Sequence, residues 1–223
     1  MKGLFHHHIG SSELVLCLAR HLANDTSQES VDALTDAVVS RFDLVERFYK
    51  LKKKLLKLPE LCDYDRYAPV GGKEPSISWK QAEELVVESF ANLSEEFEEY
   101  AMRFFMEKRI DAAHRPGKRS GAFCSFVTPD LEPVVFMNYH GSLRDVFTLA
   151  HELGHGIHAC LMKGAGFLNF DVPLTVAETA SVFAEMLLFE KLKELLPRDA
   201  LLPMYVAKIE SMLATVSRQI SMF

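Results

Sequence analysis

The sequence predicts a mainly helical protein that contains one small antiparallel β-hairpin. Apolar residues recur at spacings of three and four over most of the 223 residues, which is the period of an amphipathic helix. Serine residues suited to helix capping precede several of these stretches. Only one segment, near residues 122–139, changes to the pattern of short strands around a turn. The length allows one or two domains.

The first helical stretch is expected to begin near Glu29, after a cap at Ser27, and to continue to about Leu58. The apolar positions that predict it are Val31, Leu34, Val38, Phe42 and Val45. A loop rich in proline and glycine then follows, up to Pro75. The sequence therefore divides into a helical N-terminal segment with a linker, residues 1–75, and a second region, residues 76–223.

Two helices are expected before the hairpin. Ser78 and Gln81 form a capping box at the start of the first. Ser94 can cap the second, which is expected over about residues 95–110 because its acidic side chains lie opposite an apolar stripe.

The hairpin is expected from two short runs of strand-forming residues, 122–127 and 133–139. The turn signal Thr-Pro-Asp at residues 128–130 lies between them. Ser142 and Asp145 then mark the start of the next helix.

That helix, expected over residues 143–162, carries a metal-binding pattern. His151, Glu152 and His155 form the sequence HExxH, which is the spacing of zinc metalloproteases. Residues four apart lie one above the other on a helix, so two imidazoles can converge on one ion. Glu152 lies one position round the helix, close enough to act as a base on water without taking a coordination site.

Glu178 is the expected third ligand, because catalytic zinc often has two histidines and one glutamate and keeps a fourth position for water. A turn follows the HExxH helix, and Pro173 suits the start of the next helix. Two helices joined by a short connection pack side by side, so Glu178 can face His155. Small residues at the contact favour a close approach: Gly154, Ala177, Ala180 and Ser181.

Other polar side chains near these ligands are expected to support them. His158 lies seven residues after His151, about 10 Å along the helix, which is too far to share the ion, so it is expected to support the ligands or the fold. Each ligating imidazole needs an acceptor for its second N–H, and Ser181 and Glu185 are the residues expected to meet this need.

Two alternatives remain open for the histidines. In one, they bind zinc that only joins two helices, so that the protein is a non-catalytic zinc module. In the other, they are satisfied by hydrogen bonds and bind nothing, within a plain helical interaction domain. His6, His7 and His8 could also bind metal adventitiously.

Composition disfavours several classes of partner and location. The net charge of −6 gives no basic surface for nucleic acid. No apolar run approaches the roughly 18 residues of a membrane span. The first ten residues lack a secretory signal, and the four cysteines show no CxxC spacing, so free thiols and a cytoplasmic location are expected.

Four segments of this sequence resemble the oligoendopeptidase F branch of the thimet oligopeptidase family. They are residues 117–122 (GKRSGA), 137–139 (MNY), 148–158 (TLAHELGHGIH) and 176–181 (VAETAS). The resemblance implies a mostly helical zinc peptidase that cleaves short peptides inside a deep channel, with one zinc ion. It also implies His151, His155 and Glu178 as the zinc ligands and Glu152 as the general base.

The resemblance also implies that parts of a longer chain are missing. Family members are more than twice this length, and their C-terminal region supplies a tyrosine and a histidine that stabilise the oxyanion. Residues 191–223 contain one tyrosine, Tyr205, and no histidine. The chain is therefore expected to be the central piece of a larger enzyme, and those missing parts are among its expected partners.

Peptide binding is expected near the end of the second strand, at Met137, Asn138 and Tyr139. The edge of this strand could pair with an extended peptide by β-augmentation. The alternative is a structural hairpin whose edge is covered. Tyr139 and His140 could also replace the missing oxyanion donors, or they could simply form the turn before the HExxH helix.

Overall fold

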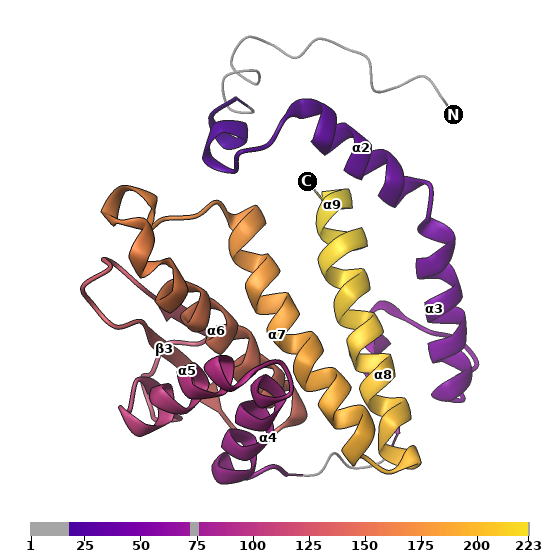
Figure 1. The fold of residues 1–223 in the computed structure, drawn as a ribbon. Coiled ribbons are helices and arrows are strands. Elements are labelled where there is room, and N and C mark those ends of the chain that lie inside the picture. Colours follow the sequence, from indigo (N-terminus) through magenta and orange to yellow (C-terminus); the bar gives the residue numbers. More distant parts are fainter. Residues whose placement is uncertain (1–17, 72–75, 223) are drawn as a thin grey trace. The chain divides into compact units, whose positions relative to one another are not determined.

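The computed structural model describes residues 18–71 and 76–222, which group into two compact units. Residues up to Gly71 form the first unit together with Arg198 onward, and residues 72–197 form the second. Within the described residues, no helix has the length and apolar character needed to cross a bilayer. Figure 1 shows the helices of each unit and the small sheet.

The first unit is helical. Its elements include α2 (Gln28–Val39), α3 (Phe42–Leu55), a 3-10 helix (Asp63–Asp65), α8 (Arg198–Leu213), a π-helical turn (Ala214–Arg218) and α9 (Gln219–Met222). Ser27 caps α2, where its hydroxyl accepts a hydrogen bond from the Ser30 N–H, as the sequence predicts.

The prediction of a single helix from about Glu29 to Leu58 is wrong, because the helix is interrupted between α2 and α3. The Ser40 hydroxyl donates to the Ala37 carbonyl at 2.8 Å, and the Arg41 N–H bonds the Val38 carbonyl in a tighter turn. Serine competes in this way for helical backbone groups. The apolar spacing continues across the break, so periodicity alone does not reveal it.

The end of the chain belongs with the N-terminal segment rather than with residues 76–197. Lys52 on α3 is buried, and its ammonium bonds Glu210 on α8 at 2.8 Å and also the Arg66 carbonyl. Phe48 and Val206 share a small apolar core with Val70. The predicted boundary at residue 75 placed this end in the second region. Linker composition indicates where one region ends along the chain, but not which later segment packs back on it.

The second unit contains four longer helices: α4 (Trp79–Ala91), α5 (Glu95–Met106), α6 (Leu143–Met162) and α7 (Leu174–Leu195). The three predicted caps are confirmed. Capping boxes start α4 at Ser78 and α6 at Ser142, and the Ser94 hydroxyl accepts from the Phe97 N–H at the start of α5.

A three-stranded sheet lies beside these helices, with the order β1 (Ile110–Ala113), β3 (Val134–Tyr139), β2 (Phe123–Ser125). The antiparallel pairing of β2 with β3 confirms the predicted hairpin. The sequence did not predict β1, which runs parallel to β3. β1 begins at Ile110, where the helix was expected to end. The helix itself stops earlier, at Met106, and Lys108 then adopts a left-handed backbone (φ 56°) that is incompatible with its continuation.

The position of β3 corrects the expectation that a peptide pairs with its edge. β3 is the central strand, so β1 and β2 already pair with most of its backbone groups. Beyond β2, the Met137 carbonyl accepts a hydrogen bond from Lys118 at 2.6 Å. The outer edges of the sheet belong to β1 and β2.

Helices α6 and α7 pack against each other at very short range (Figure 1). A Cβ atom added to Gly154 would lie 2.8 Å from the Ala180 carbonyl oxygen and from the Ala184 Cβ, and 2.9 Å from the Ser181 Cα. Only glycine fits there. The close approach predicted from small residues is confirmed, and it brings the side chains of the two helices together.

Candidate metal centre

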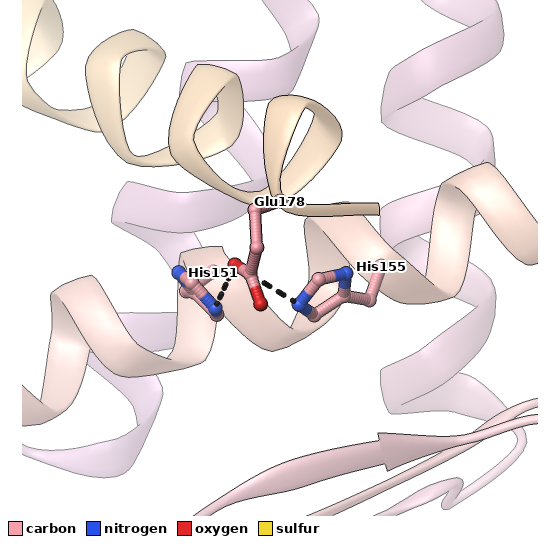
Figure 2. A group of neighbouring side chains, drawn as sticks. All are labelled: His151, His155 and Glu178. Atoms are coloured by element: carbon pink, nitrogen blue, oxygen red, sulfur yellow. Dashed lines mark ion pairs between the residues drawn. The ribbon is translucent and has the colours of Figure 1, made fainter. Parts of the chain in front are cut away.

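Three predicted ligands meet between α6 and α7. His151 and His155 project from successive turns of α6, and Glu178 reaches between their imidazoles from α7 (Figure 2). One ligand atom from each residue lies within 4.8 Å of the others. Within the described residues this is the only such group of three or more ligands. His6 to His8 lie outside the described residues.

The spacing of these atoms fits a zinc ion. The Glu178 Oε2 atom lies 3.3 Å from the His151 Nε2 and 3.7 Å from the His155 Nε2. Two atoms held at about 2.0 to 2.1 Å from an ion in tetrahedral geometry are ~3.4 Å apart. By contrast, the direct hydrogen bond from His151 to Glu185 is 2.7 Å. The ligand spacing therefore leaves room for an ion between the three atoms.

One side of the group faces solvent. The Glu178 side chain is 51 % exposed, whereas those of His151 and His155 are 25 % and 15 % exposed. Solvent can therefore reach the group from the side of Glu178, as a catalytic zinc site with an open coordination position would require.

Hydrogen bonds orient the predicted ligands His151 and Glu178. His151 Nδ1 bonds the Glu185 carboxylate, so this nitrogen carries the proton and Nε2 is left free as a ligand. The Ser181 hydroxyl lies 2.8 Å from the Glu178 Oε2. Both predicted supporting residues thus contact a ligand, although Ser181 holds the glutamate rather than an imidazole.

Sequence reasoning missed the partner of the other histidine. The His155 imidazole forms a hydrogen bond with the backbone of Ala177. No side-chain pattern signals a backbone carbonyl, so this contact could not be read from residue types. His158 is half-buried, its pKa is lowered by burial, and no described hydrogen bond joins it to a ligand. Its supporting role stays a prediction.

Glu152 lies beside the ligands and is buried, with 6 % of its surface exposed. Burial raises its pKa to about 7, and the charge of Glu178 adds to this effect, while His151 and a hydrogen bond from the Cys124 backbone oppose it. The Cys124 N–H on β2 is a second backbone contact that the sequence could not reveal. A carboxyl with a pKa near neutrality can accept and release a proton at physiological pH.

The two histidines experience opposite shifts. Burial lowers the pKa of His155, and the charge of His151 lowers it further. The pKa of His151 is raised. Burial, the largest single effect, lowers it, but the hydrogen bond that His151 donates to Glu185 and the charges of three glutamates together outweigh burial. The carboxylates around His151 thus favour a positive charge at this position.

The structure gives the predicted peptide-binding residues other contacts. The Met137 side chain is 1 % exposed, and the Asn138 amide donates to the Arg119 carbonyl at 2.8 Å. The Tyr139 hydroxyl donates to the Ile77 carbonyl at 2.8 Å, and burial raises its pKa to about 12. The roles of these residues in peptide binding, and of Tyr139 as an oxyanion donor, stay predictions.

Comparison with known proteins gives consistent matches. The family model described as Peptidase family M3 matches residues 16–223. Oligoendopeptidase F, chromosomal, of Lactococcus lactis subsp. cremoris is 30% identical over 172 residues, which are 77% of this chain and 28% of that protein. Oligopeptidase PepF of Bacillus subtilis (strain 168) is 30% identical over 171 residues, 76% of this chain and 25% of that protein.

A solved structure shows the same fold. It is the crystal structure of a candidate oligoendopeptidase F from Bacillus anthracis str. Ames, with a TM-score of 0.79 and 20% sequence identity. The match covers 94% of this chain and 39% of that one. This chain therefore spans between a quarter and two fifths of the length of the three proteins compared.

Proposed function

The chain belongs to peptidase family M3, and from this premise we propose that it is the metal-binding core of a zinc-dependent endopeptidase that acts on short peptides. The observation that carries the proposal is the meeting of His151, His155 and Glu178 beside the buried Glu152. The printed names of the relatives, oligoendopeptidase and oligopeptidase, support peptides as substrates.

We propose that these three ligands hold one zinc ion. Two imidazole nitrogens and one carboxylate oxygen are a donor set that zinc favours, and their spacing supports the assignment. When bound, zinc supplies Lewis acidity, which polarises a carbonyl and makes a water easier to deprotonate.

Glu152 is proposed to move the proton. Its carboxylate is held by the Cys124 N–H and has a pKa of about 7, so it can take a proton from the attacking water. The same carboxyl can then release that proton to the amine that leaves when the peptide bond breaks. Because Glu152 coordinates nothing itself, both steps are open to it.

The proposed activity of this chain alone is low. The family resemblance assigns the oxyanion donors to a C-terminal region, and the chain spans only part of its relatives' length. Loss of one such donor lowers kcat by about 100-fold to 1000-fold. Those missing parts are therefore proposed partners. The same short span favours, as a second candidate, a zinc module that binds metal without catalysis.

The test compares the chain with its Glu152→Gln variant on internally quenched peptides of six to ten residues, after loading with zinc. The proposal predicts one zinc in both proteins and cleavage that falls by at least about 100-fold in the variant, because the general base is lost. Equal zinc content with no cleavage by either protein would contradict enzymatic activity of this chain on its own and favour the non-catalytic zinc module.

We also propose a cytoplasmic location. Cys62, Cys124 and Cys160 are free thiols in the described part of the chain, which is typical of a reducing compartment. Fractionation of cells that express the tagged protein from its own gene tests this placement.

A further inference from the structure

The loop between β1 and β2 carries three cations, and one of them has no acidic partner. Arg115 makes two hydrogen bonds to the Asp111 carboxylate, at 2.9 and 2.8 Å. The Lys118 ammonium is covered, and it donates to the same carboxylate at 3.0 Å and to the Met137 carbonyl at 2.6 Å. Over the described ranges 18–71 and 76–222, no carboxylate lies within ion-pair distance of Arg119.

Arg119 is nonetheless held in a defined place. Its backbone carbonyl accepts the hydrogen bond from Asn138. Its guanidinium lies over the ring of Phe123, 5.6 Å from the centroid, and that ring stacks on Phe136 at 4.9 Å. A cation resting on an aromatic ring is pre-ordered, so it loses less conformational freedom when it binds an anion.

Strand β2, which carries the Phe123 ring beneath Arg119, borders the candidate metal centre. Phe123 is the first residue of β2, and the N–H of the next residue, Cys124, bonds the Glu152 carboxylate. Within the sheet, β2 pairs only with β3, so its second edge is the one that offers this N–H to Glu152. Arg119 therefore lies beside the start of an edge strand that leads to the general base.

The distance along this edge determines how long a peptide must be to contact both Arg119 and Glu152. Ordinary bond lengths and the 5.6 Å step from Phe123 put the guanidinium within about 15 Å of the Glu152 carboxylate. An extended peptide rises ~3.3 Å per residue, so about four or five residues cover this distance. An antiparallel peptide would place its C-terminal part, which carries the free carboxylate, at Phe123 beside the Arg119 cation. A parallel peptide would bring its positively charged N-terminal part there, so charge favours the antiparallel direction.

We propose that Arg119 determines specificity by binding a carboxylate on the C-terminal side of the peptide, within about five residues of the bond that is cut. This inference rests on the proposed function, and it adds a reason for a preference for short peptides. A free α-carboxylate so close to the cleaved bond exists only when the peptide ends there. A glutamate or aspartate side chain offers the same chemistry to the guanidinium.

The test measures peptide binding to the zinc-loaded chain carrying Glu152→Gln, in which turnover is suppressed. Three N-terminally labelled peptides without internal acidic residues are compared by fluorescence anisotropy: a free acid, the same peptide as an amide, and an amide whose last residue is glutamate. Each is titrated against the parent chain, Arg119→Ala, Arg119→Lys and the control Arg115→Ala. Arg115 is a matched control because it is exposed in the same loop and already paired with Asp111.

The proposal predicts that the parent binds the acid at least about 10-fold more tightly than the amide, as expected for a charge-assisted pair. In Arg119→Ala the two affinities become equal, Arg119→Lys retains part of the difference, and Arg115→Ala retains all of it. If the amide that ends in glutamate binds as tightly as the acid in the parent, and only as tightly as the plain amide in Arg119→Ala, this result supports the proposal and shows that a side-chain carboxylate is also recognised. If it binds like the plain amide, the site takes only the α-carboxylate.

Two results overturn the proposal in different ways. Equal binding of acid and amide by the parent, or a preference that survives Arg119→Ala, removes Arg119 from recognition and leaves peptide binding intact. If none of the three peptides binds the zinc-loaded parent, the proposed function fails, and the role of Arg119 fails with it. Unchanged zinc content in Arg119→Ala shows that the fold is preserved.

Discussion

The side chains that hold the ligands decide how well the metal centre is ordered. Glu185 fixes the proton of His151 on Nδ1 through a 2.7 Å hydrogen bond. We predict that Glu185→Ala weakens zinc affinity by about 10-fold to 100-fold, because the ligand loses its orientation. Competition with a zinc-binding dye measures the dissociation constant. Glu190→Ala, an exposed residue of the same helix paired with Lys193, is the control and keeps the parental affinity.

If Glu185→Ala and Glu190→Ala bind zinc equally well, the hydrogen bond to His151 has no role in metal binding. His6 to His8 are replaced by alanine in all these proteins so that they contribute no metal.

Cys124 reports on the packing of β2 against Glu152. Burial raises the pKa of its thiol to about 12, and the charge of Glu152 adds to the effect. Because the pKa is raised, the thiol stays protonated until the pH approaches 12. At pH 8.5 the reactive thiolate is about a thousandfold scarcer than for an unperturbed cysteine.

We therefore predict that iodoacetamide at pH 8.5 labels Cys124 in urea but hardly in the native protein. Peptide mapping by mass spectrometry distinguishes it from the other thiols, and Cys124→Ser identifies its peptide. Equal labelling in both states would contradict the covered position of the Cys124 thiol.

At the scale of single residues, contacts made by characteristic side chains could be predicted from the sequence, whereas hydrogen bonds made by main-chain groups could not. HExxH, with Glu178 and Glu185, could be found because a metal needs these residue types at helical spacings. The hydrogen bonds from Cys124 to Glu152 and between Ala177 and His155 involve main-chain groups, which every residue carries. From the sequence, Lys118 and Arg119 could either hold a peptide carboxylate or form a solvated basic turn. The pairing of Arg115 and Lys118 with Asp111 singles out Arg119.

Among the elements, the contact between α6 and α7 places Glu178 opposite the histidines. We predict that Gly154→Ala destabilises the protein by up to about 2 kcal/mol and also weakens zinc binding. A Cβ there would meet Ala180 and Ala184 at 2.8 Å. Alanine favours a helix by about 1 kcal/mol over glycine, but overpacking a tight contact costs about 1 to 3 kcal/mol, so the clash prevails.

Urea denaturation and zinc titration measure the two effects. Gly164→Ala is the control, because no atom lies within 4 Å of its added Cβ. A Gly154→Ala protein as stable as the parent, with parental zinc affinity, would show that the helices need not approach so closely.

Long elements with caps were predicted well, and short or interrupted ones were not. The helix over residues 143–162 has the predicted bounds because its capping box and its apolar spacing agree. Strand β1 has four residues and pairs with a strand more than twenty positions away, so nothing local specifies it. The break at Ser40 depends on one hydroxyl bond within a continuous apolar pattern.

At the scale of the whole molecule, the first and last segments of the described chain form one unit through a buried ion pair. The Lys52 side chain is fully covered, and Glu210 is its carboxylate partner. We predict that Glu210→Gln destabilises this unit by about 3 kcal/mol, because an unpaired charge remains buried.

Hydrogen exchange followed by mass spectrometry localises the effect. Protection of α3 and α8 should fall together, while α6 and α7 keep theirs, since they belong to the other unit. Glu46→Gln, which removes an exposed pair with Lys50 on α3, should change little. Equal loss of protection throughout the chain would show that the two units do not unfold separately.

The division into units could not be predicted from the sequence, because it depends on a contact between residues 158 positions apart. The linker composition near residue 72 indicated a boundary, but it could not show that residues 198–222 return to the first unit. The candidate metal centre, by contrast, lies mostly on two helices that follow each other along the chain, which explains why the meeting of His151, His155 and Glu178 could be predicted.

The most direct test of the account is anomalous X-ray diffraction at the zinc edge from crystals of the zinc-loaded chain. We predict one strong peak within about 2.0 to 2.2 Å of the His151 Nε2, His155 Nε2 and Glu178 Oε2 atoms. No peak between these atoms, or a Glu178 carboxylate turned away from a zinc held by other residues, would contradict the account.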